Sequence, residues 1–240
     1  MKSRRDRGHI LAVAVMLTTI LAVPGILSAH QPGYTDSFML EECEGFSSIG
    51  SNPFFILEPG FQLILAGEED GVDLRLTITV LNKTRTIDGT KTRVVEERET
   101  HDGEVVEVSK NYFAICNRNN SVVYFGEDVD IYENGVIVSH AGSWRAGVNG
   151  ARAGIIMPGI VLLGARYFQE VAPGVALDRA EIVSLSEVVQ TPAGTFAKCL
   201  KTEETTLLEP GQTGFKWYAP GIGFVQDGVL KLVEIHRRGE

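Results

Sequence analysis

The chain has 240 residues, of which 44% are hydrophobic and 22% are charged, and its formal net charge is −9. A chain of this length and composition can bury one substantial core, so we expect a globular protein. The acidic balance argues against partners such as nucleic acid or anionic lipid, because such a surface would repel them.

The first 29 residues have the features of a secretory signal peptide. Basic residues precede an uncharged apolar run, residues 10–29, that ends in small residues; the basic residues are Lys2, Arg4, Arg5 and Arg7. Pro24 and Gly25 interrupt the end of the run, which favours cleavage over an uncleaved membrane anchor. We therefore expect export to the periplasm or the medium, with residues 1–29 removed and no stable membrane span remaining.

Residues 30–60 are predicted to form an extended lead-in to a single β domain, residues 61–240. The lead-in contains Asn52-Pro53-Phe54-Phe55, whose aromatic pair we expect to pack against the core. It also contains Glu58-Pro59-Gly60, a turn that can start the first strand.

From about residue 61 onward, apolar and polar residues alternate with the period of two that is typical of β-strands. The clearest alternation places five apolar residues on one face: Val72, Leu74, Leu76, Ile78 and Val80. Turn dipeptides suited to hairpins separate the segments: Asp70-Gly71, Asp88-Gly89, Asp102-Gly103, Asn134-Gly135 and Asp227-Gly228. The predicted strands are 61–67, 72–83, 90–100, 104–116, 121–126, 136–140, 165–171, 179–190, 195–208, 213–219 and 222–236, the last broken at Asp227-Gly228.

No segment shows the pattern of a long amphipathic helix. The fold class is therefore predicted to be all-β, an antiparallel meander that forms a barrel or curved half-barrel. A two-sheet sandwich is the alternative.

Residues 141–164 are predicted to form one long irregular loop, and loops of this length often bind ligands. The segment offers an aromatic face, an amide and two cations: Trp144, Asn149, Arg145 and Arg152. In the alternative interpretation the segment plugs one end of the barrel, with Trp144 in the core and both arginines paired with surface acids.

An acidic cluster precedes this loop and is followed by a histidine. Glu127, Asp128, Asp130 and His140 are candidate acids and bases, with Arg145 and Arg152 as charge stabilisers. The alternative is a solvated acidic hairpin. The histidines are isolated, and no phosphate loop, dinucleotide fingerprint or serine nucleophile motif is present, so we expect no metal and no cofactor.

Three cysteines, Cys43, Cys116 and Cys199, allow at most one disulfide in an oxidising compartment, and the sequence leaves the pairing open. Cys116 and Cys199 lie in apolar strand-like segments, where we expect them to be buried.

The C-terminal third contains Pro192-Ala193-Gly194-Thr195-Phe196 and Lys216-Trp217-Tyr218-Ala219-Pro220-Gly221-Ile222-Gly223. Together with Asn52-Pro53-Phe54-Phe55 and Tyr124-Phe125-Gly126-Glu127-Asp128, these segments resemble a widespread group of secreted bacterial β-proteins of unassigned function. The two C-terminal segments, as a pair, are also similar to exported β-proteins that share the curved sheet of periplasmic lipoprotein carriers. The resemblance implies a fold more than a function.

Two functional hypotheses follow. The first is an exported binding protein whose concave face holds a hydrophobic or amphipathic ligand, with Trp217 or Tyr218 lining that face beside the loop residues. The second is an extracellular hydrolase or lyase that uses the acidic residues and arginines at the loop-covered end. A structural domain without a pocket is a third possibility, and no pattern indicates an oligomeric state.

Overall fold

A computed structural model of the protein describes residues 33–237. The predicted signal peptide, residues 1–29, lies outside the described residues. One short 3-10 helix, η1 (Leu40–Cys43), precedes the strands. The strands are β1 (Phe46–Ser47), β2 (Ser51–Asn52), β3 (Phe55–Ile56), β4 (Gln62–Glu69), β5 (Val72–Ile87), β6 (Thr90–His101), β7 (Glu104–Cys116), β8 (Val122–Glu133), β9 (Val136–Ser139), β10 (Trp144–Arg145), β11 (Arg152–Met157), β12 (Arg166–Phe168), β13 (Glu170–Val171), β14 (Asp178–Thr191), β15 (Gly194–Thr206), β16 (Gly214–Ala219), β17 (Gly223–Asp227) and β18 (Leu230–His236).

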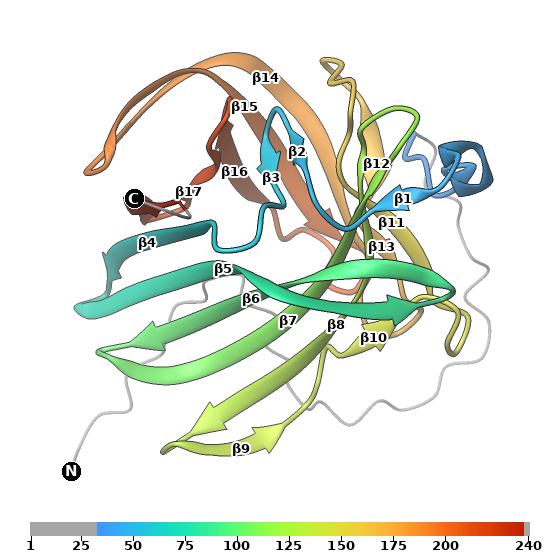
Figure 1. Ribbon diagram of the computed structural model, residues 1–240. Coiled ribbons are helices and arrows are strands. Elements are labelled where there is room, and N and C mark those ends of the chain that lie inside the picture. The colour runs from blue at the N-terminus through green and yellow to red at the C-terminus, as the bar shows by residue number, and fades with distance from the viewer. Residues whose placement is uncertain (1–32, 238–240) are drawn as a thin grey trace.

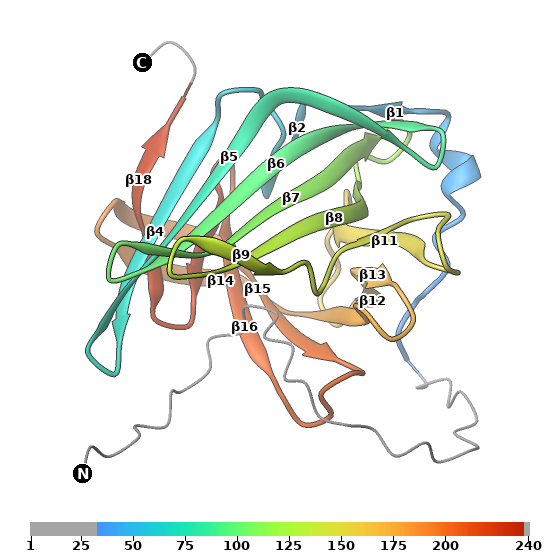
Figure 2. The ribbon, with the colours of Figure 1, turned by 90° about the horizontal axis from the view of Figure 1, so that it is seen from below.

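Most strands form one antiparallel sheet that curls into a nearly closed barrel (Figure 1, Figure 2). Along the sheet the order is β12-β14-β15-β16-β17-β18-β4-β5-β6-β7-β8-β11-β13. The two end strands, β12 and β13, are separated in the chain only by Gln169. One segment therefore pairs with β14 through β12 and with β11 through β13, which joins the two edges of the sheet. The predicted all-β barrel is confirmed.

Four of the five predicted hairpin turns have the backbone dihedral angles that their Asp-Gly or Asn-Gly pairs favour. Asp70, Asp88, Asp102 and Asn134 all adopt positive φ, and so does the glycine that follows each of them. Two successive residues of positive φ are the mark of the type I′ turn, which matches the twist of antiparallel strands. At the fifth predicted turn, Gly228 but not Asp227 has positive φ.

Two sequence predictions are wrong in detail. The strand predicted over 121–126 continues to Glu133 as β8, because its acidic half pairs with residues 107–111 of β7. The segment 141–164 is not irregular throughout, since it contains β10 and β11, which both pair with β8. Strands make up 8 of the 24 residues of the predicted loop, and the other residues form turns, bends and irregular backbone.

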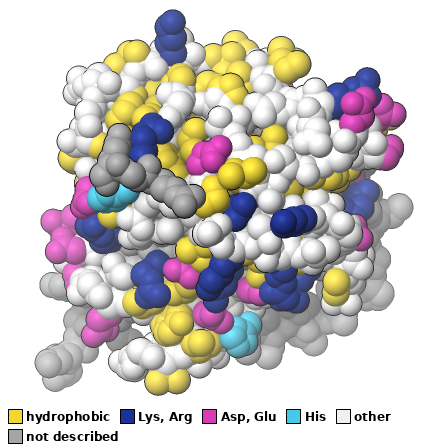
Figure 3. Space-filling view, in the orientation of Figure 1, with side chains coloured by type: hydrophobic (Ala, Val, Ile, Leu, Met, Phe, Trp, Pro, Cys, Tyr) yellow, Lys and Arg dark blue, Asp and Glu magenta, His cyan; other side chains and the backbone are white. Residues whose placement is uncertain are grey.

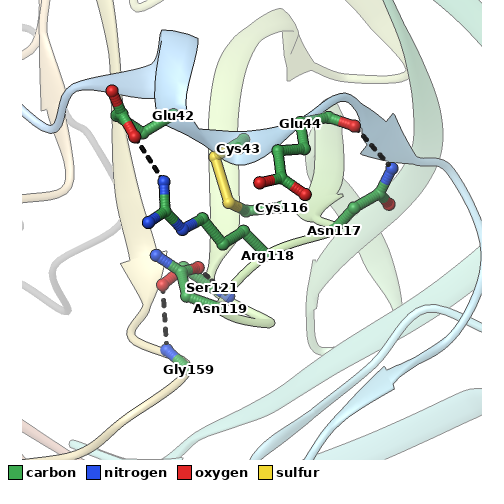
Figure 4. The surroundings of a disulfide bond; sticks show 9 residues. All are labelled: Glu42, Cys43, Glu44, Cys116, Asn117, Arg118, Asn119, Ser121 and Gly159. Atoms are coloured by element: carbon green, nitrogen blue, oxygen red, sulfur yellow. Dashed lines mark hydrogen bonds and ion pairs between the residues drawn. A yellow bond between two sulfur atoms is a disulfide. The ribbon is translucent and has the colours of Figure 1, made fainter.

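A disulfide fastens the lead-in to the barrel. Cys43 at the end of η1 is bonded to Cys116 at the end of β7 (Figure 4). Near it, Arg118 pairs with Glu42, and the side chain of Asn117 donates to the backbone carbonyl of Glu44 (Figure 4). Cys116 is therefore bonded, and Cys199 is the buried free thiol. None of the helices in the described part of the chain is long and apolar enough to cross a membrane.

Reduction of this disulfide should lower the stability of the barrel. The bond spans 73 residues, and a loop of that length corresponds to about 4 kcal/mol of chain entropy removed from the unfolded state. Urea unfolding with and without a reductant measures the difference. The Cys199→Ala variant is the control and should respond to the reductant as the wild type does. An unfolding midpoint that does not move on reduction would contradict the bond.

Candidate functional site

The barrel encloses a cavity of about 240 Å³ whose lining has two chemically different parts. One part is apolar and includes Phe54, Phe55, Phe61, Leu63, Ile78, Val80, Phe113 and Phe224. The other part is acidic and includes Glu97, Glu99, Glu107, Glu127, Glu170, Asp178, Glu204 and Asp227. These residues come from strands all around the barrel and from the lead-in.

The alternation of neighbouring strands builds this division. Every second residue of β6 faces the cavity, in the order Val95, Glu97 and Glu99. Every second residue of β7 does the same, in the order Phe113, Asn111, Ser109 and Glu107. Because the strands are antiparallel, Glu97 lies opposite Ser109, and Glu99 lies opposite Glu107. The inward face of β6 and that of β7 each have an apolar end and an acidic end. The two acidic ends are neighbours in the sheet, and so are the two apolar ends.

A bulge at Gly126 brings Glu127 into the same space. The register between β7 and β8 shifts between Asn111 and Phe113, so that Tyr124 and Glu127 both line the cavity. Gly126 has a φ of 144°, and a Cβ atom there would lie 2.5 Å from the carbonyl oxygen of Trp144. Glycine is therefore needed at this position.

The hairpin of β2 and β3 brings the lead-in to the apolar end. The buried side chain of Asn52 donates to the carbonyl oxygens of Asn120 and Pro158, at 2.9 and 3.0 Å. Its Oδ1 accepts the backbone N–H of Phe54 at 2.8 Å. The next aromatic ring, Phe55, packs edge-on against Phe113 with 5.0 Å between ring centroids. These contacts fix two aromatic rings in the cavity wall.

Lys216 is the only Lys or Arg among the described residues that line the cavity. Its Nζ lies 2.8 Å from a carboxylate oxygen of Glu204. Burial acts to lower the pKa of Lys216, but attraction to Glu204 and Asp227 outweighs it and raises the pKa well above the ordinary value. Lys216 is therefore charged and forms an ion pair with Glu204.

Burial raises the pKa of several cavity carboxyls, and the neighbouring carboxylates add to the effect. The pKa of Glu107 rises to about 7, with Glu99 and Glu97 contributing after burial. The pKa of Glu127 rises to about 8, because burial and the nearby Glu107 outweigh a hydrogen bond from Tyr124. Burial also raises the pKa values of Glu97 and Glu170. The cavity therefore holds carboxyls that change protonation near neutral pH.

The structure distributes the predicted catalytic residues over different surfaces. Glu127 lines the cavity, whereas the next residue, Asp128, faces outward and accepts hydrogen bonds from Tyr112 and Arg85. Arg145 joins this outer cluster through Asp128. The remaining three candidates form two further pairs elsewhere, Asp130 with His140 and Arg152 with Asp36.

The predicted ligand-binding residues are separated in the same way. Tyr218 lines the cavity, but its neighbour Trp217 does not. Trp144 is 6% exposed and packs edge-on against Tyr124 at 5.2 Å, as in the alternative that placed it in the core. Asn149 is an exposed turn residue with a φ of 51°. Of the predicted site residues, Glu127 and Tyr218 line the cavity.

Sequence reasoning missed most of the acidic lining. The signal was present in the inward positions of β6 and β7, where Glu97, Glu99 and Glu107 lie at a spacing of two from other residues that face the cavity. It was hidden because β6 also carries Glu96 and Arg98, so both of its faces look polar.

Comparison of the chain with models of known protein families, with curated proteins and with solved structures found no match. Among the described residues, no group of three or more His, Cys, Asp or Glu has the arrangement of a metal site.

The empty barrel should lose stability as the pH rises from about 5 to about 8. Glu107 and Glu127 have pKa values of about 7 and about 8 in the folded protein, above the ordinary value of 4.5. Between those values the folded state binds more protons than the unfolded state, so the free energy of unfolding falls with increasing pH. For Glu107 alone the loss is on the order of 3 kcal/mol.

Thermal unfolding of the wild type and of the Glu107→Gln variant across this pH range tests the expectation. The variant should show a flatter profile and a higher melting temperature at pH 8. Glu96→Gln, next to Glu97 but on the outer face of β6, is the matched control. A wild-type stability that rises between pH 5 and pH 8 would show that these carboxyls are not enclosed as described.

Proposed function

We propose that this protein is an exported binding protein that holds a small amphipathic molecule inside its barrel. The observation that carries the proposal is the two-part lining of a single cavity, with aromatic and aliphatic side chains facing one region and carboxyls the other. An amphipathic molecule has the same division between an apolar body and a polar group. Cavities that combine an apolar wall with a few polar groups are typical of small-molecule sites.

The energetic character of the cavity supports this proposal. Protein interiors are normally close-packed, and enclosed carboxyls without partners destabilise the folded state. A barrel built only for structure would be more stable with apolar residues at those positions. Residues that oppose stability in this way are common at functional sites.

Export is the second part of the proposal. The first 29 residues have the order of features of a signal peptide, and a disulfide is compatible with an oxidising compartment. Both features are consistent with a protein that meets its ligand outside the cytoplasm.

The alternative of a hydrolase or lyase has less support. It required acids and arginines around one cavity, but Asp128 and Arg145 face away from the cavity that Glu127 lines. Raised carboxyl pKa values remain compatible with acid or base catalysis, yet no arginine lines the cavity to stabilise charge within the described residues.

Native mass spectrometry of protein purified from an exporting host, followed by titration with a neutral environment-sensitive dye, tests the binding proposal. We expect a co-purified small molecule or saturable dye binding that a short-chain alcohol displaces. Ser109→Phe should abolish binding, because Ser109 is buried and lines the cavity between its two parts.

The matched control is Ser186→Phe, the same change at an exposed position of β14, which should bind as the wild type does. The proposal fails if the wild type is empty and takes up no dye. It also fails if both variants bind the dye equally well, because the dye would then occupy a surface outside the cavity.

A further inference from the structure

We propose that the ligand is an organic cation, with an amine or quaternary ammonium group attached to an apolar body. This inference rests on the proposed function and names the chemical class of molecule that the cavity selects. The ammonium group would lie among the carboxyls, and the apolar body would lie against the aromatic end.

The charge inside the barrel is strongly unbalanced. Eight carboxyl groups line the cavity, against the single cation Lys216. Lys216 forms an ion pair with Glu204 at 2.8 Å and also attracts Asp227, so one cation serves all the acids of the described wall. Carboxyls in a cavity are screened poorly by water and salt, so a bound cation would interact with them strongly and would favour their ionised form. The lining therefore favours a ligand of positive charge.

Glu97 is the clearest sign of a missing partner. It lies opposite Ser109 in the cavity wall, and the charge of Lys216 acts on it although Lys216 forms its ion pair with Glu204. Glu107, two residues from Ser109 on β7, also lines the cavity, where Glu99 and Glu97 act on it as like charges. An enclosed carboxyl without a partner is unfavourable in the ionised form. A positively charged group in the cavity would satisfy both side chains.

The apolar wall indicates that the cation carries a carbon skeleton. Phe54 and Phe55 reach the cavity from the lead-in, and Phe113 faces them from β7. Tyr124 lies between this aromatic end and Glu127. Aromatic faces attract organic cations and also bury aliphatic groups. A bare metal ion would leave this half of the cavity without a function.

The outer surface differs from the cavity in its distribution of charge. Lys and Arg side chains are spread over the face shown in Figure 3, interspersed with acidic side chains. Arg85 and Arg145, for example, share Asp128 on the outside of β8. Acidic and basic side chains therefore pair on this outer cluster, whereas acids outnumber cations eight to one in the described cavity wall. This arrangement would reject anionic amphiphiles such as fatty acids.

Ligand binding should be linked to the release of protons. Glu127 is faced by Tyr124, Glu107, Glu97 and Asp178, and its pKa is about 8 in the empty barrel. A nearby ammonium group favours the ionised carboxylate and lowers that pKa. The affinity for a permanent cation should therefore increase between pH 6 and pH 9.

The test is calorimetric titration at pH 8 with three molecules that share one chain: octylamine, octanol and octanoate. We expect octylamine to bind at least about tenfold more tightly than octanol, which corresponds to one close charge interaction, and octanoate to bind most weakly. Octyltrimethylammonium, whose charge does not titrate, measures the dependence on pH.

Glu97→Gln and Glu107→Gln should each weaken octylamine binding at least about fivefold, a larger loss than either variant causes for octanol. Glu96→Gln, on the outer face of the same strand as Glu97, should change neither. Removal of an enclosed charge is not expected to prevent folding, and the melting temperature of each variant checks this.

Three outcomes would overturn the inference. If octanoate or octanol binds as tightly as octylamine, the cation preference is wrong, while the proposed binding function stands. If Ca²⁺ or Zn²⁺ alone binds in a way that Glu97→Gln abolishes, and octylamine does not bind, the site takes a metal instead. If none of the probes binds and the neutral dye also fails, the proposed function fails with the inference.

Discussion

Closure of the sheet is the constraint on which the rest of this structure depends. The segment from Arg166 to Val171 pairs with β14 through its first half and with β11 through its second half. Once the edges are joined, the alternation of side chains along each strand places every second residue inside the barrel and the residues between them on the outside. Side chains such as Glu97 and Glu107, which would be ordinary on an open sheet, become interior groups because of this closure.

The barrel tolerates so many interior acids by treating them in different ways. Glu204 is paired with Lys216 and also accepts a hydrogen bond from Gln169. Glu170, at 4% exposure, accepts the backbone N–H of Asp178. Glu107 and Glu127 have raised pKa values instead, so they avoid charge by keeping protons. These are the usual responses to enclosed charge, and the last of them leaves groups that a ligand can still ionise.

Much of the fold could be predicted because its signals are local. The Asp-Gly and Asn-Gly pairs set the hairpins, and the alternation from Val72 to Val80 marks an inward face in both sequence and structure. The site could not be predicted in the same way, because it depends on which face closure turns inward. The bulge at Gly126 turns the side chain of Glu127 inward, and part of the stretch after residue 141 forms the strand β11 that pairs with β8. The sequence pattern predicts a binding role for Trp144, because it does not show that this ring is buried and packs edge-on against Tyr124.

The net charge of the chain gives no indication of this interior. A formal charge of −9 describes the long-range field and disfavours nucleic acid, but acids on the outside and acids inside contribute to it equally. The inner carboxyls lie in a partly buried space, where charges interact more strongly than they do on the outside. Under the proposed function, the carboxyls that lower the stability of the barrel are also the groups that would distinguish one ligand charge from another. Stability and selectivity would then depend on the same few side chains.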